Sequence, residues 1–243
     1  MDFSSRITRL PRAYDPEQGQ DARAMFPTLS DDLADLVEGA AGCSPYLKTL
    51  AEKERDWLPG ALEAPEAALE ALEGELRETA PEALADALRQ GKRRVALLIG
   101  LADLAGVWPL EEVTGRLTDF ADLACDLAMK ACVGAEIRRG KLPGKSAEDL
   151  DRAGGMVALA MGKMGAGELN YSSDIDLICL FDETQFDESE YHEARASFVR
   201  ATRKMAAMLN DRTAEGYVFR TDLRLRPDPS VTPVCLAMAA AET

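Results

Sequence analysis

The spacing of apolar residues along this chain changes once, near Pro143, and this change constrains the fold more than any other feature. Before Pro143 apolar residues recur every three or four positions, which is the period of an amphipathic helix. After it they form short continuous runs or alternate with polar residues, as β-strands do. The sequence therefore predicts an α+β fold in which an all-helical amino-terminal region precedes a part built on a sheet.

The same pattern suggests domain bounds. We expect a flexible arm at residues 1–15, where there is little periodicity, a helical region at 16–142, and a sheet-containing core at 143–243. Prolines and glycines divide the helical region. Helices are expected from about Pro16 to Gly39 or Gly42, from Pro45 behind a Ser44 cap, over 64–76, from Pro81 to Gly106, and from Trp108 to about Arg138.

Charge and composition exclude several classes of function. The chain has 243 residues and a net charge of −15, and a surface this acidic repels nucleic acid. It contains no apolar run of 18 residues, and its first residues lack the apolar core of a signal peptide, so we expect a cytoplasmic protein away from the membrane. Five cysteines without a C-x-x-C pair suggest packing residues, and a single histidine, His192, argues against histidine chemistry.

An apolar run at Met156–Met161 opens the second part and predicts a strand buried on both faces. The glycine-rich stretch 162–167 follows at once. A glycine turn that leaves a strand can bring backbone N–H groups close to phosphates, although a plain tight turn would need the same glycines. It is neither a Walker A sequence nor a dinucleotide-binding fingerprint.

Asp174 and Asp176 lie one residue apart in the stretch 170–181 and are the strongest functional signal. On a strand they project from the same face, with Cα atoms about 7 Å apart. Two carboxylates this close repel each other, and a shared divalent cation is the usual reason to tolerate that repulsion. An ordinary surface strand remains an open alternative.

A second strand, predicted at 217–226 after a helix over 188–211, adds a third acid. Asp222 alternates there with Arg220, Arg224 and Arg226, opposite an apolar face. If this strand lies beside the first, three carboxylates could bind two Mg²⁺ ions and the guanidinium groups could bind phosphates. An exposed antiparallel strand could show the same alternation.

The order of strand, glycine turn, Ser-Asp-x-Asp strand, helix and acid-bearing strand resembles the DNA polymerase β-type nucleotidyltransferase fold, which has a mixed sheet. The amino-acid sequence of several segments resembles more specifically the bifunctional glutamine synthetase adenylyltransferase and adenylyl-removing enzyme family. The resemblance covers most of the chain. Its segments are Gly162–Gly165, Glu168–Leu177 and Arg220–Pro227, with Gly42–Leu47 and Ala102–Trp108 in the helical region.

The resemblance implies a function and a site. Members of this family carry two catalytic domains in a longer chain, and the Asn170–Ser173 lead resembles that of the first. That domain removes AMP from a tyrosine of glutamine synthetase by phosphorolysis, releases ADP and so regulates nitrogen assimilation. The sequence ends soon after the second motif, so we expect a fragment truncated at its C-terminal end. A Gly162-Lys163 pair stands where the wider superfamily often has Gly-Ser.

The implied ligands follow from the family. Three carboxylates would bind Mg²⁺ or Mn²⁺, with Asp222 completing one ion's shell or acting as a base. The glycine turn and Ser173 would position the phosphate oxygens of the nucleotide, ADP or ATP, and Lys163 or Arg220 would hold inorganic phosphate. The partners implied are glutamine synthetase and a PII-type signal protein. The predicted site residues are Asp174, Asp176, Asp222, Gly162, Lys163, Gly165, Ser173, Arg220 and Arg224.

Three other functions remain open from the sequence. The chain could attach AMP to a protein with ATP, or it could be a catalytically silent fragment that binds glutamine synthetase or the signal protein. A purely structural helical domain is the third, and the alternation of arginine and aspartate after Phe219 argues against it.

Overall fold

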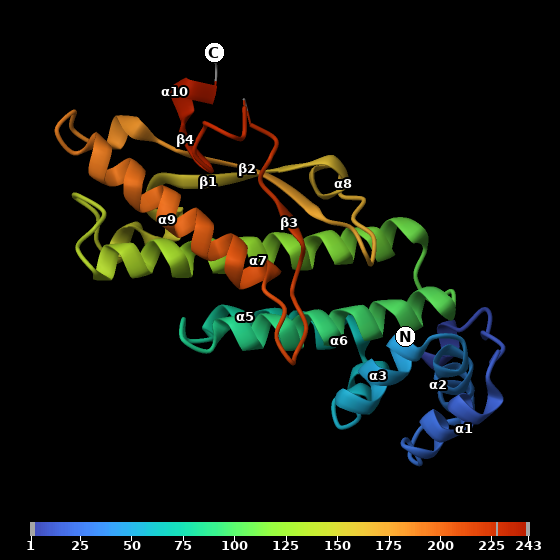
Figure 1. Cartoon of the computed structure of the whole chain (residues 1–243). Coiled ribbons are helices and arrows are strands. Elements are labelled where there is room, and N and C mark those ends of the chain that lie inside the picture. The colour runs from blue at the N-terminus through green and yellow to red at the C-terminus, as the bar shows by residue number, and fades with distance from the viewer. Residues whose placement is uncertain (1–2, 227, 242–243) are drawn as a thin grey trace. The chain divides into compact units, whose positions relative to one another are not determined.

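A computed structural model describes residues 3–226 and 228–241 (Figure 1). The described residues form two compact units. The first runs to Thr79 and includes Gln90–Phe120, and the second consists of Ala80–Arg89 and the residues from Ala121 onward. The element order confirms an α+β fold with a helical amino-terminal region and a mixed sheet later in the chain. The domain bounds predicted from the sequence remain a prediction.

The first unit contains helices throughout, and its breaks follow from proline and polar caps. Ser44 accepts a hydrogen bond from the Leu47 N–H at 3.2 Å, and Pro45 takes the first helical position, as predicted. The helices of this unit are α1 (Pro16–Ala24), α2 (Asp31–Cys43), α3 (Pro45–Lys53), α4 (Leu58–Glu63) and α5 (Pro65–Glu78), with most of α6 (Leu84–Leu104) and the start of α7 (Leu110–Arg138).

The helix predicted to begin at Pro16 and end at Gly39 or Gly42 is wrong in two respects. It is interrupted between α1 and α2, where Pro27 cannot continue a helix, and both glycines lie inside α2. A Cβ atom at Gly39 would lie 1.9 Å from the Pro11 carbonyl oxygen. These glycines therefore allow the segment before α1, predicted to be a loose arm, to pass against α2.

The two longest helices end in the same way. Gly106 follows α6 and Gly140 follows α7, with φ of +65° and +64°. The next residue in each case donates its N–H back into the last turn, from Val107 to Ala102 and from Lys141 to Glu136. This left-handed cap favours glycine, and it confirms the predicted end of α7 at Arg138.

The second unit is built on a sheet centred on β2 (Ile175–Phe181). Strand β1 (Met156–Met161) pairs with it in the antiparallel direction, while β3 (Thr221–Asp222) and β4 (Cys235–Ala237) pair with it in parallel at its two ends. Helix α9 (Tyr191–Asn210) packs on the sheet through a buried face (Figure 1), where the rings of Phe181 and Phe198 stack 4.9 Å apart.

Two predictions about the strands need correction. The first strand lies where expected, but it is not buried on both faces, since Leu159 and Met161 are exposed. Among the described residues it forms an edge of the sheet and pairs with β2 alone.

The second strand is far shorter than the predicted 217–226. The N–H groups of Val218 and Phe219 both bond to the Leu209 carbonyl, and beyond Asp222 the chain turns away, with Leu225 exposed.

Several elements were not expected from the sequence. They are helix α4, which begins at Leu58 where Leu58-Pro59-Gly60 was expected to break the helical pattern, the one-turn helix α8 (Gly162–Gly165), strand β4, helix α10 (Met238–Ala241) and short 3-10 turns at Ser4–Arg6, Ala147–Gly155 and Glu183–Gln185. The predicted packing role of the cysteines is in keeping with four buried thiols, whereas Cys43 is exposed. None of the described helices has the length and hydropathy needed to cross a bilayer.

Candidate active site

The parallel pairing of β2 and β3 brings two of the predicted acids side by side. Asp176 is the register partner of Asp222, and Ile175 is the partner of Thr221. The Ile175 N–H also bonds to the Arg220 carbonyl at 2.9 Å. Two acids that are about 45 positions apart in the sequence therefore meet at the start of β2. An exposed antiparallel strand, the alternative left open by the sequence, would not need to bring them together.

The third acid, Asp174, lies just before β2 and is held by the loop that precedes it. The Asn170 side chain accepts hydrogen bonds from the Ser172 N–H and the Ser173 hydroxyl, which fixes a turn. Arg220 donates to the Ser172 carbonyl at 2.9 Å and pairs with Asp174 through its Nε at 2.5 Å. One arginine therefore ties the turn and the first carboxylate together.

Arg224 forms the corresponding pair with Asp222. Its guanidinium reaches an Asp222 carboxylate oxygen at 2.5 Å, and its backbone N–H donates to the other oxygen at 2.8 Å. The Arg224 guanidinium and this N–H hold the pKa of Asp222 below its ordinary value. The pKa of Arg224 is raised by Asp222 first and also by the charges of Asp176 and Asp174, so all three carboxylates lie near one guanidinium.

Two glycines make room beside these acids. Gly162 has a φ of +59°, and a Cβ atom there would lie 3.1 Å from an Asp176 carboxylate oxygen. A Cβ atom at Gly165 would lie 2.3 Å from the Ala160 carbonyl oxygen. The turn of α8 can follow β1 this closely only because neither residue has a side chain.

Not every predicted residue is brought into contact with the acids. Lys163 is exposed in α8, and Ser173 is engaged with Asn170. Arg226, which the strand pattern placed beside Arg224, instead donates to the carbonyls of Leu223, Pro229 and Thr232. Its role in the structure is to hold the loop after β3.

The acids have the donor chemistry for hard divalent cations, since carboxylate oxygens are the ligands that Mg²⁺ and Mn²⁺ prefer. Among the residues described, no three acidic, histidine or cysteine side chains are arranged so that they already hold a metal ion. Two of the three predicted ligands, Asp174 and Asp222, are instead paired with arginines. Cations would have to replace these arginine contacts, so the metal site remains a prediction.

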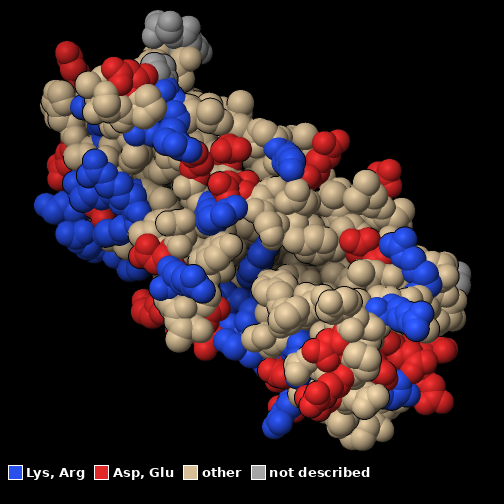
Figure 2. Space-filling model, turned by 45° about the vertical axis from the view of Figure 1, so that its right-hand side comes forward, with Lys and Arg blue, Asp and Glu red and all other residues tan. Residues whose placement is uncertain are grey.

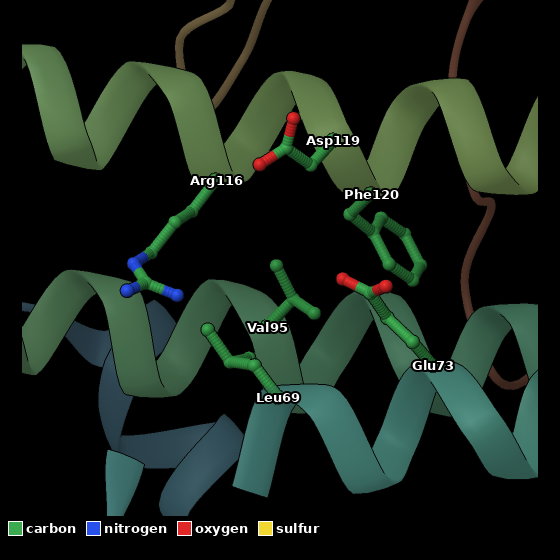
Figure 3. Close-up of a pocket in the computed structure, with 6 residues that line it drawn as sticks. All are labelled: Leu69, Glu73, Val95, Arg116, Asp119 and Phe120. Carbon is green, nitrogen blue, oxygen red and sulfur yellow. The ribbon is translucent and has the colours of Figure 1, made fainter. Parts of the chain in front are cut away.

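A pocket in the first unit lies away from these residues in the sequence (Figure 3). Its lining combines an apolar floor with three charged side chains, and its volume is about 30 Å³. That is room for about one water molecule and far too little for a nucleotide. The lining residues are Leu69, Glu73, Val95, Arg116, Asp119 and Phe120.

A family described as glutamate-ammonia ligase adenylyltransferase matches residues 28–243. The chain belongs to this family. The matched range contains the second unit, most of the first unit and all three acids, so the resemblance seen in the sequence motifs is confirmed for most of the chain.

Curated relatives in this family carry the name bifunctional glutamine synthetase adenylyltransferase/adenylyl-removing enzyme. A protein of Bradyrhizobium sp. (strain BTAi1) is 44% identical over 85% of this chain, and one of Bradyrhizobium diazoefficiens is 42% identical over 93%. A Caulobacter vibrioides relative is 38% identical over 98% of the chain. The chain spans only 22%, 23% and 26% of the lengths of these three relatives.

The structure adds residues that sequence reasoning had not assigned to the site. Asn170 organises the turn before Asp174, and the Ser172 carbonyl anchors Arg220. The role of Asn170 could have been predicted from the sequence, because an asparagine side chain commonly accepts a hydrogen bond from the backbone N–H two residues later and so fixes a turn. Nothing in the sequence indicated which acid Arg220 would contact.

Proposed function

We propose that this chain contributes an adenylyl-removing site, which takes AMP from a tyrosine of glutamine synthetase by phosphorolysis and releases ADP. The observation that carries this proposal is the pairing of Asp176 with Asp222 on parallel strands, with Asp174 two residues away. Three carboxylates near the guanidinium of Arg224 provide the donors and the counter-charges that phosphoryl transfer needs. Family membership supports the substrate class through the names of the relatives.

The direction of transfer rests on the loop before the first acid. The Asn170–Ser173 lead resembles the removing domain of the family, and the structure gives this lead a definite turn held by Arg220. The alternative is attachment of AMP from ATP, which the bifunctional relatives are also named for. The same three acids would serve either direction, so the two require a direct assay.

In the proposed reaction an oxygen of inorganic phosphate attacks the adenylyl phosphorus. The bond from phosphorus to the tyrosine oxygen breaks, and that oxygen takes up a proton from solvent. Bound Mg²⁺ or Mn²⁺ would neutralise charge at the phosphorus. Asp174, Asp176 and Asp222 would hold the ions, and Arg220 or Lys163 would orient the phosphate. Arg224 lowers the pKa of Asp222, and a cation bound by this carboxylate would have to replace the guanidinium contact.

The site assignment is tested by replacing two acids. The double variant Asp174→Asn/Asp176→Asn keeps the side-chain size and removes two charges, and we expect it to abolish ADP release from adenylylated glutamine synthetase. The assay is made on this chain and on the full-length Bradyrhizobium diazoefficiens relative changed at the aligned positions. The matched control is Asp151→Asn/Asp211→Asn, which changes two exposed acids outside the site. Undiminished release in the first variant, or equal loss in the control, would contradict the assignment.

The same preparations separate the remaining functions. Release of ADP that requires phosphate indicates removal, while incorporation of labelled AMP from ATP without phosphate indicates attachment. Calorimetric titration with Mn²⁺ and ADP then tests for a silent binding fragment, because a module that only binds glutamine synthetase or a PII-type protein needs neither ligand.

A further inference from the structure

A dense group of cations lies where α7 ends and α9 runs beside it. Figure 2 shows Lys and Arg side chains gathered at the left edge of the molecule, on the side where Figure 1 shows the end of α7 and the start of α9. We call this group the basic patch. It consists of Arg139, Arg200 and Lys204, which contact one carboxylate, of Lys141, whose backbone is held beside α9, and of Arg138 and Arg203, which are exposed and adjacent to these residues in sequence.

A single buried carboxylate joins the two parts of the basic patch. The Glu136 side chain is fully buried and accepts hydrogen bonds from Arg200 and Lys204, each at 2.9 Å, and from Arg139 at 3.2 Å. Burial alone would raise the pKa of Glu136, but Lys204 and Arg200 lower it below its ordinary value. Glu136 therefore stays ionised and fixes three cations in a defined arrangement.

The other three cations have no such partner. Arg138, Lys141 and Arg203 are exposed, and none of them forms an ion pair with a carboxylate in the part of the chain that the structure describes. Lys141 is held beside α9 because the Ser197 hydroxyl donates to its backbone carbonyl. Glu136 thus neutralises part of the charge of three cations, while three more lie exposed without a paired carboxylate among the described residues, in a chain whose net charge is −15.

An ordinary solvated surface, on which both signs of charge are mixed, would not show this local excess of positive charge. Like charges held together repel one another, and the chain has acids in surplus that could have been interspersed. The basic patch therefore favours a negatively charged partner that contacts the patch and not the acidic remainder of the surface. A long nucleic acid would also meet the negative field of the rest of the molecule, whereas the acidic part of a folded protein can approach only the patch.

We propose that the basic patch is a docking surface for an acidic region of a protein partner. This proposal rests on the proposed function in one respect, which is that the partner is the adenylylated protein substrate. The patch is distinct from the acids on β2 and β3, so it contributes binding and steering of the substrate, and no step of the chemistry. Arginine is suited to this use because its planar guanidinium binds carboxylates through two parallel hydrogen bonds.

The test is a matched pair of charge reversals. Arg138→Glu/Arg203→Glu reverses two patch residues that form no ion pair, so the fold should not depend on them. Arg12→Glu/Arg212→Glu makes the same change at two exposed arginines that are not in the patch. Binding to immobilised adenylylated glutamine synthetase is measured by biolayer interferometry at low and at high salt. Circular dichroism melting curves show whether both variants are folded.

We expect the patch reversal to weaken binding about tenfold or more at low salt, mainly through slower association, and the control to change it less than about twofold. Added salt should weaken binding of the unmodified chain and have little effect on the patch variant. Equal losses in both variants, undiminished binding of the patch variant, or no binding of the unmodified chain would each overturn the proposal.

A second probe separates the partner classes. Single-stranded DNA of 30 nucleotides is titrated against the same proteins, and we expect only weak binding. Tight DNA binding that the patch reversal removes would contradict a protein partner. Failure of the proposed function is distinguishable, because binding that depends on the patch without any phosphate-dependent ADP release would leave the docking surface in place and contradict only the reaction.

Discussion

Arg220 contacts the neighbouring segment with both its backbone and its side chain. Its carbonyl accepts from the Ile175 N–H, while its guanidinium contacts Asp174 and the Ser172 carbonyl. This residue therefore sets the strand register and the position of the first acid at once. The side-chain contacts are exposed, and exposed ion pairs are worth little free energy, so their effect is on geometry more than on stability.

At the same scale, Gly165 is a position where a single methyl group should not fit. We expect Gly165→Ala to lower the free energy of unfolding by about 1–3 kcal/mol, because its Cβ atom would meet the Ala160 carbonyl oxygen and force β1 and α8 apart. The control is Gly74→Ala in α5, where a Cβ atom would meet nothing within 4 Å and helix propensity favours alanine. Urea denaturation measures both variants, and an equal or greater loss at Gly74 would contradict the argument.

At the scale of elements, α5 is tied to its neighbours in the first unit by one carboxylate. Glu66 accepts from the Arg6 guanidinium at 2.7 Å and from the Trp108 indole N–H at 2.9 Å. Burial of Glu66 raises its pKa, but these two hydrogen bonds outweigh burial and lower the pKa to about 2. The segment before α1, the start of α5 and Trp108 between α6 and α7 therefore meet at a group that stays charged.

This contact predicts a pH dependence. Because the folded pKa of Glu66 lies below its unfolded value, its stabilising effect is present above pH 4.5 and is lost as the pH falls from 4.5 toward 2. Glu66→Gln should lower the free energy of unfolding at pH 7 by about 1 kcal/mol, allowing for its partial exposure, and should flatten the acid side of the stability curve.

Denaturant titrations from pH 7 to pH 3 measure this, with the exposed Glu70→Gln on the same helix as control. A variant at position 66 whose acid sensitivity equals that of the unmodified chain would contradict the role given to this carboxylate.

The elements also show what a sequence pattern can predict. The end of α7 and the bounds of β1 followed from periodicity and from a glycine cap, which are local signals, whereas Asp174, expected on a strand with Asp176, lies just before β2. The length of β3 could not be predicted in this way. The alternation of polar and apolar residues after Tyr217 is the same whether or not the backbone pairs with another strand. The Leu209 carbonyl takes the N–H groups of Val218 and Phe219, and no local pattern reveals this.

The same limit applies to the candidate site. Asp174 and Asp176 could be selected from the sequence because two carboxylates one residue apart repel each other, and Asp222 because it alternates with arginines. The structure pairs Asp176 with Asp222. The contacts that arginine side chains make could not be predicted, since long flexible side chains reach any acid within several ångströms. Strand β4 was missed because three small apolar residues, Cys235–Ala237, carry no period.

At the scale of the whole molecule, the sheet does not stand apart from the helical region. The second half of α7 belongs to the unit with the sheet, where Glu136 meets α9 and Val133 lies near Gly154. The start of α6 belongs to it as well, since the buried Arg89 donates to the carbonyls of Met208, Asp211 and Gly216. The unit is therefore assembled from two stretches of the chain that are separated in sequence.

This organisation predicts how fragments behave. A fragment of residues 143–243, which the change in sequence pattern would suggest as a domain, keeps α9 but lacks the parts of α6 and α7 that pack against α9 and Gly154, so it should not fold cooperatively. A fragment of residues 80–243 retains them and should. Amide dispersion in NMR spectra and the sharpness of thermal unfolding distinguish the two. A cooperative transition in the shorter fragment would contradict the assignment of α6 and α7 residues to this unit.

The parallel pairing of β2 with β3 also has a consequence for the order of folding. A parallel connection closes only after the intervening crossover has formed, so contacts between residues 175 and 221 are among the costly, non-local ones. While the chain is being synthesised, β1 and β2 can pair early as near neighbours in sequence, but the third acid arrives late. We therefore expect the three carboxylates to come together only after the crossover through α9 has formed.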